Sequence, residues 1–163
     1  NKTKLKDLKE KESLLNKNNF YGEGHIGIFS QLALNYERQI SLGKKVSWYG
    51  RIGGGYGVNL IDGIFDGTDG WGGLCAITML TGEKNNHFEL NAGAFFGFEK
   101  YVHIYWDHIP PAPPFPVHSH NTYDPFMFPI FNIGYRYQKP DGGFIFRVNA
   151  GIISLGLSIG YAF

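Results

Sequence analysis

The sequence predicts an all-β protein: a closed eight-stranded antiparallel transmembrane β-barrel with a short N-terminal helical extension. Three observations lead to this fold class. The final residues, 154–163, alternate strictly between apolar and small side chains, the pattern of a strand with one apolar face. Aromatic residues make up 17% of the chain, and 23 of its 163 residues are glycine. No run of about 18 apolar residues could form a membrane-spanning helix, so the alternation favours a barrel that faces lipid.

Length and charge exclude several classes of protein. The length of 163 residues is that of one domain, and the net charge of +1 argues against nucleic-acid binding. The single cysteine, Cys75, predicts neither an intrachain disulfide nor redox chemistry. No signal peptide precedes the predicted strands, and because such a barrel needs export, we infer a signal that has been removed.

Residues 1–19 form a separate, basic segment. They carry six lysines against Asp7, Glu10 and Glu12, a net charge of +3. The stretch 3–17 resembles a short helix that is too charged to cross a membrane. We expect a periplasmic extension here, either mobile and solvated or docked as a helix, followed by the barrel at residues 20–163.

Alternating segments separated by turn residues give the predicted strands. They are residues 21–26, 29–40, 46–56, 71–81, 87–98, 126–138, 144–153 and 155–163. Residues 20–40 could instead be one long strand, which would leave seven. With eight strands both termini lie at one end, together with the short turns at 41–45, 82–86 and 139–143. The segments 57–70 and 99–125 become long loops at the other end, the asymmetry expected of outer-membrane barrels with periplasmic termini.

The segment 87–98 shows the alternation most clearly. Phe88, Leu90 and Phe96 would face lipid, whereas Glu89 and Asn91 would face inward. The facing of 71–81 stays open. The last strand should pair with residues 20–26 to close the barrel.

Charged residues occupy six inward positions on six different strands. They are Glu23, Glu37, Arg51, Glu89, Arg136 and Arg147. An eight-stranded barrel is filled by side chains, and buried charges need partners, so we expect an internal salt-bridge network that plugs the barrel. The alternative is a transport or catalytic role for these charges.

The predicted outer loop at 99–125 is rich in aromatic residues, proline and histidine. Its candidate binding surface comprises Tyr105, Trp106, Phe115 and Tyr123, and its weak candidate metal ligands are His103, His108, His118 and His120. This loop could contact another protein or a glycan, or it could fold over the mouth of its own barrel. The histidine spacing matches no standard metal site, and we expect no cofactor.

Several stretches resemble a known family. They are residues 34–38, 87–93, 134–147 and 157–163. The chain from about residue 20 is similar to the small outer-membrane β-barrel proteins common in Bacteroidota. Tyr161 and Phe163 resemble the C-terminal signal read by the barrel-assembly machinery, with Ser158 where that signal often has glycine. The resemblance implies a fold and a location in the bacterial outer membrane, but no catalytic residues.

The sequence therefore predicts an outer-membrane protein that acts structurally, or as a binding or accessory subunit of a larger outer-membrane complex through its outer loops. Its expected partners are outer-membrane lipid, lipopolysaccharide, the barrel-assembly machinery and other outer-membrane proteins. The alternatives are a narrow pore for small solutes and a lipid A-modifying enzyme. We expect no enzymatic activity, because His118 and Ser119 form the only adjacent His–Ser pair and lack a third catalytic partner.

Overall fold

The computed structural model describes residues 17–42, 46–59, 69–83, 85–107, 115–152 and 154–163, with the backbone alone at residues 42, 59, 83 and 100–121. The N-terminal extension predicted for residues 1–19 falls outside the described residues up to residue 16. Asn18 and Asn19 already belong to the first strand, so the strand begins two residues before the predicted boundary.

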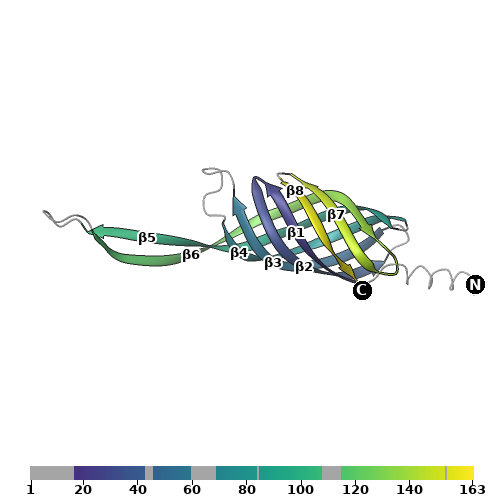
Figure 1. Cartoon of the computed structure of the whole chain (residues 1–163), viewed down its shortest axis with the longest axis horizontal. Coiled ribbons are helices and arrows are strands. Elements are labelled where there is room, and N and C mark those ends of the chain that lie inside the picture. The colour runs from purple at the N-terminus through teal and green to yellow at the C-terminus, as the bar shows by residue number, and fades with distance from the viewer. Residues whose placement is uncertain (1–16, 43–45, 60–68, 84, 108–114, 153) are drawn as a thin grey trace, which may run out of the picture.

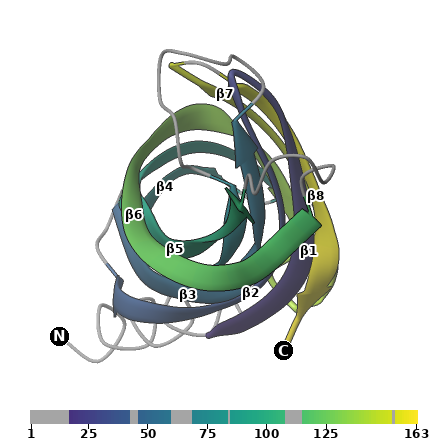
Figure 2. The ribbon, with the colours of Figure 1, turned by 90° about the vertical axis from the view of Figure 1, so that its left-hand side faces the viewer.

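Eight antiparallel strands form one closed barrel, each pairing with the next and the last pairing with the first (Figures 1 and 2). They are β1 (Asn18–Gly27), β2 (Phe29–Leu42), β3 (Val46–Asn59), β4 (Gly70–Glu83), β5 (Asn86–Asp107), β6 (Phe115–Gln138), β7 (Gly143–Gly151) and β8 (Ser154–Ala162). No helix in the described part of the chain is long and apolar enough to cross a membrane.

The barrel closes between β1 and β8. The two strands pair from Asn19 with Ala162 to Gly27 with Ser154, which confirms the predicted pairing of the last strand with the first. Backbone hydrogen bonds of 2.8 and 3.1 Å join Phe163 to Asn18 at the end of this pair. Because β1 and β2 are separate paired strands, the seven-strand alternative is wrong.

Side chains alternate between the two faces of the wall as the sequence predicts. On β8, Leu155, Leu157 and Ile159 are exposed outward, whereas Ser158 and Ala162 are buried. The facing of β4, which the sequence left open, is now defined. Leu74, Ala76, Thr78 and Leu80 point inward, and Trp71, Cys75 and Ile77 point outward.

The predicted loop at 99–125 is wrong for most of its length. β5 and β6 continue as a paired ribbon from Glu99 with Asp124 to Asp107 with Phe115, and they extend well beyond the barrel (Figure 1). Aromatic and β-branched residues at 101–106 favour a strand here, and an isolated ribbon tolerates Pro116 at its edge. The proline-rich part of the predicted loop, residues 110–116, lies outside the described residues, except for Phe115 and Pro116.

Among the described residues, the pairing of β6 with β7 stops short of the end of the barrel opposite the C-terminus, here called the distal end. β6 pairs with β7 only over Asn132–Gln138, although its pairing with β5 continues far beyond that point. Pro125 and Pro129, which lack the N–H that a strand flanked by two partners needs, lie in this one-sided stretch. The edge of β6 before Asn132 therefore has no β7 partner among the described residues.

Candidate functional site

The half of the barrel interior nearer the C-terminus contains charged side chains. Glu23, Glu37, Arg51, Glu89, Arg136 and Arg147 come from six strands and are each at most 2% exposed. Alternation aims each of them inward, and small residues on the neighbouring strands leave them room. The structure thus brings together all six charges that the sequence placed inside.

Glu89 lies at the centre of one half of this charge network. Its Oε2 accepts a hydrogen bond of 2.6 Å from Arg136 Nε, and both of its oxygens accept from Arg147 Nε at 3.1 Å. Arg136 also donates through Nη2 to both oxygens of Glu37 at 2.9 Å. Two arginines and two glutamates therefore form one continuous chain of paired charges across the lumen.

Glu23 anchors the other half. It is paired with Arg51, and the Ser158 hydroxyl donates to its Oε2 at 3.2 Å. Arg147 joins the two halves, since its Nη1 lies 3.9 Å from Glu23 Oε2 and 3.8 Å from Glu37 Oε2. The Arg147 guanidinium carbon lies 4.3 Å from the centroid of the Tyr21 ring. The Tyr21 hydroxyl donates a hydrogen bond of 3.0 Å to Glu37 Oε2.

On the distal side of the charge network, an apolar cluster lies in the lumen. Its centre is Phe95, whose ring lies 5.8 Å from that of Phe29 and 6.0 Å from that of Phe126. Phe29 stacks on Phe128 at 4.2 Å. The charge network and this apolar cluster follow one another along the lumen.

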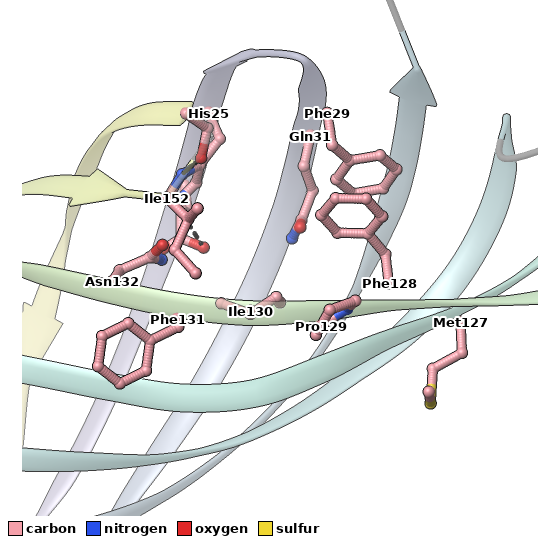
Figure 3. Close-up of a pocket in the computed structure, with 12 residues that line it drawn as sticks. His25, Phe29, Gln31, Met127, Phe128, Pro129, Ile130, Phe131, Asn132 and Ile152 are labelled. Carbon is pink, nitrogen blue, oxygen red and sulfur yellow. Dashed lines mark hydrogen bonds and ion pairs between the residues drawn. The ribbon is translucent and has the colours of Figure 1, made fainter. Parts of the chain in front are cut away.

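A cavity of about 260 Å³ opens beside the free edge of β6 (Figure 3). Residues 127–131 of β6 line one side, and Ile152 lines another. Outward-facing Met127, which is 63% exposed, lines the cavity together with inward-facing Phe128. The cavity therefore passes around the edge of β6 and connects the interior with the outer surface of the wall.

The polar side of this cavity contains a histidine between a serine and a glutamate. His25 Nδ1 lies 3.3 Å from the Ser154 hydroxyl, and His25 Nε2 lies 3.3 Å from Glu23 Oε1. Strand pairing explains the arrangement, because β1 and β8 place Gly156 directly opposite His25. A Cβ at Gly156 would overlap the His25 ring, so glycine is what lets the imidazole lie flat against β8.

Two side-chain amides supply further donors to the cavity. Asn132 and Gln31 both line it, and they are 4% and 7% exposed. Among the described residues neither Asn132 Nδ2 nor Gln31 Nε2 has a hydrogen-bond partner. A side chain at Gly151 would clash with the Asn132 carboxamide and press on the Ser154 hydroxyl, so these two polar groups approach the same point.

The other predicted site residues lie elsewhere. Tyr161 and Phe163 are exposed on the outer face of the wall at the C-terminal end, and Tyr123 is exposed at the base of the β5–β6 ribbon. Tyr105, Trp106 and Phe115 belong to the ribbon strands rather than to a loop.

The histidines of the ribbon are placed by the backbone register. His103 pairs with His120, and His118 pairs with Tyr105, while His108 lies outside the described residues. The described side chains include no group of three or more histidine, cysteine, aspartate or glutamate residues that could hold a metal ion.

Sequence reasoning placed Glu23 in the charge network but missed His25 and Ser154. These two residues are 129 positions apart in the chain, and the closure of the barrel alone brings them together. The predicted pairing of residues 155–163 with 20–26 was the signal that could have found them, since it aligns the ends of β1 and β8.

Comparison with known proteins supports the fold. No protein-family model and no curated protein sequence matches the chain. Among solved structures, the chain is similar to the N-terminal β-barrel domain of Pseudomonas aeruginosa OprF. The match has a TM-score of 0.52 and 11% identity, and it covers 91% of this chain and 98% of that one. The two share an eight-stranded antiparallel barrel fold.

Proposed function

We propose that this protein is an integral β-barrel of the bacterial outer membrane, of the Bacteroidota type, with both termini in the periplasm. The observation that carries the proposal is the apolar outer surface. Large apolar side chains are exposed on all eight strands, among them Trp71 at 73% and Leu32 at 72%. A surface of this extent around a closed barrel needs a hydrocarbon environment. The likeness to the OprF barrel domain supports the same location.

We further propose a structural or accessory role rather than transport. The paired charges and the aromatic cluster lie in the lumen and support this proposal, because an eight-stranded barrel is narrow enough for side chains to close it to solutes. The ribbon formed by β5 and β6 projects beyond the wall and offers a surface to another outer-membrane protein or to lipopolysaccharide. Tyr161 and Phe163 would present the chain to the barrel-assembly machinery.

We expect no steady unit conductance from the full chain in planar lipid bilayers, because the buried ion pairs and rings occupy the lumen. Insertion would be verified by the heat-dependent change in gel mobility of the folded barrel. Reproducible unit currents from verified samples would contradict the plugged barrel and favour the alternative of a narrow pore.

Removing the ribbon should abolish partner binding without opening the barrel. The register allows a clean excision: residues 100–123 are replaced by Asn-Gly, which joins Glu99 to its paired residue Asp124 through a two-residue turn. In cells, we expect the set of cross-linked outer-membrane partners to be lost. A matched control replaces residues 140–141 in the opposite turn by Asn-Gly. An unchanged partner set in the ribbon variant would reject the accessory role.

A further inference from the structure

We propose that the cavity beside the free edge of β6 is a hydrolytic site for the acyl ester of a membrane lipid. Ser154 is its nucleophile, His25 its general base and Glu23 the residue that orients the histidine. This activity goes beyond the structural role proposed above, and it departs from the sequence-based expectation of a non-enzymatic barrel. It rests on three independent features of the cavity: the order of the three side chains, the two unpartnered amides and the opening through the wall.

The order of the three side chains is that of a serine-hydrolase triad. A histidine activates a serine when one ring nitrogen accepts the hydroxyl proton and the other donates to a carboxylate. His25 lies between the two groups at 3.3 Å on each side, which is within reach of the contacts that tighten once substrate binds. Arg51 pairs with Glu23 Oε1, the same oxygen that faces His25, and Ser158 donates to Oε2, so both carboxylate oxygens are held in place.

The amide nitrogens of Asn132 and Gln31 provide donors for an oxyanion. Both side chains are more than nine-tenths buried and line the same cavity, and neither nitrogen has a partner among the described residues. Leaving a buried donor without a partner costs about 1–3 kcal/mol. Other buried donors in the lumen, such as Asn35 Nδ2 and Arg51 Nη1, also lack a partner among the described residues, so what distinguishes these two amides is their place in the lining of the cavity. A carbonyl oxygen of a bound substrate would satisfy them, and more strongly when it becomes negatively charged. Asn132 is the nearer candidate, because its carboxamide and the Ser154 hydroxyl both border the space left by Gly151. The carboxamide oxygen now faces this space, so the amide group must rotate for its nitrogen to donate there.

The apolar lining of the cavity and the unpaired edge of β6 point to the substrate class. Met127 and Phe131 of β6, and Ile152 after β7, line the cavity and are more than half exposed on the outer face of the barrel. In a lipid-embedded barrel this face contacts acyl chains, so a chain can enter laterally without leaving the hydrocarbon. Its ester group would then lie at the polar side of the cavity, next to Ser154.

The proposed reaction proceeds in two steps. The Ser154 Oγ attacks the ester carbonyl carbon while its proton passes to His25 Nδ1, and the carbonyl oxygen becomes an oxyanion. The bond between this carbon and the alkoxy oxygen breaks, His25 returns the proton to that oxygen, and the alcohol leaves an acyl-serine. A water molecule then attacks the acyl carbon, giving its proton to His25, which returns it to Ser154 as the fatty acid is released.

The first test is covalent labelling of the full chain, refolded in phospholipid vesicles, with a fluorophosphonate that carries an alkyl tail. We expect a phosphonyl adduct on Ser154, located by peptide mass spectrometry of the unsubstituted protein. Ser154→Ala should lose the label, whereas Ser47→Ala, which removes a buried hydroxyl at the opposite end of the barrel, should keep it. Absence of an adduct on Ser154 in folded protein would overturn the proposal.

The second test is turnover of p-nitrophenyl esters of increasing chain length. We expect kcat/KM to rise with chain length, and His25→Gln to lower it by about 100-fold or more while the heat-dependent gel mobility is retained. Fatty-acid release from phospholipid vesicles and from lipopolysaccharide would then show which lipid supplies the ester. No hydrolysis of any of these esters by labelled protein would reject catalysis, and it would leave the outer-membrane location untouched.

Discussion

Glu89→Leu is expected to lower the free energy of unfolding of the barrel by about 3–5 kcal/mol, because removing one partner of a buried ion pair leaves an uncompensated charge. Here the loss affects two cations at once. Arg136 and Arg147 both donate to Glu89 and are both fully buried. The measurement is urea-induced unfolding of the protein in lipid vesicles, followed by tryptophan fluorescence.

The matched control for this prediction is Asp141→Asn, which removes an exposed carboxylate in the turn between β6 and β7. Its effect should stay within about 0.5 kcal/mol, as for other surface substitutions. A loss below about 1 kcal/mol for Glu89→Leu would mean that water reaches Arg136 and Arg147, and the lumen would then be hydrated rather than plugged.

Leu157→Arg should destabilise the membrane-inserted barrel by about 2–4 kcal/mol, the cost of a cation on the lipid face near the bilayer midplane. Leu157 is 57% exposed and lies near the middle of β8, pairing with Gly24 on one side and Val148 on the other. Unfolding in vesicles of defined lipid composition measures the change.

Ile40→Arg provides the depth control for Leu157→Arg. Ile40 is 68% exposed but lies near the end of β2, close to the turn into β3, where the cost of a cation falls to about 0–1 kcal/mol. Equal costs at the two positions would show that the middle of β8 is not surrounded by hydrocarbon, which would contradict the membrane location proposed for the barrel.

Most of the barrel could be predicted from the sequence because a strand with a lipid face and a lumen face imposes a period of two on its residues. In β8 every apolar residue of that pattern is exposed, and Gly156 and Ser158 are buried. The inward charges could be predicted in the same way, since Glu89 and Arg147 interrupt otherwise apolar segments at positions that the alternation assigns to the lumen face. Alternation along the sequence was sufficient to predict a strand wherever one face of that strand contacts lipid and the other faces the lumen.

The length of the β5–β6 ribbon could not be predicted in this way. Beyond the barrel a ribbon has no lumen and no lipid face, so its sequence loses the alternation that identifies the other strands. Prolines at 110–116 suggested a loop, yet pairing continues to Asp107 and Phe115 because cross-strand hydrogen bonds do not depend on which side chains face a core. The aromatic and β-branched residues at 101–106 were the available signal.

The cavity at the wall could not be predicted from the sequence for a different reason. Its side chains come from β1, β2, β6 and β8, and their meeting depends on where the pairing of β6 with β7 stops. The pairing stops there because β7 and β8 have only 9 residues each, whereas β6 has 24. Predicting this point would require the lengths of strands that lie far apart in the sequence. His25 read alone is one inward residue among many, and Ser154 reads as a turn residue.

The short seam between β6 and β7 has a consequence for how the barrel opens. These strands share backbone hydrogen bonds over seven residues, whereas β5 and β6 are joined along the whole of β5. The free energy of local opening scales with the number of bonds that must break together. The amide protons bonded between Asn132–Gln138 and β7 should therefore exchange with solvent deuterium before those of the other seams. The barrel would thus open first between β6 and β7. The sheet formed by β1–β6 would stay paired, and the β7–β8 hairpin would stay attached to it through the pairing of β8 with β1.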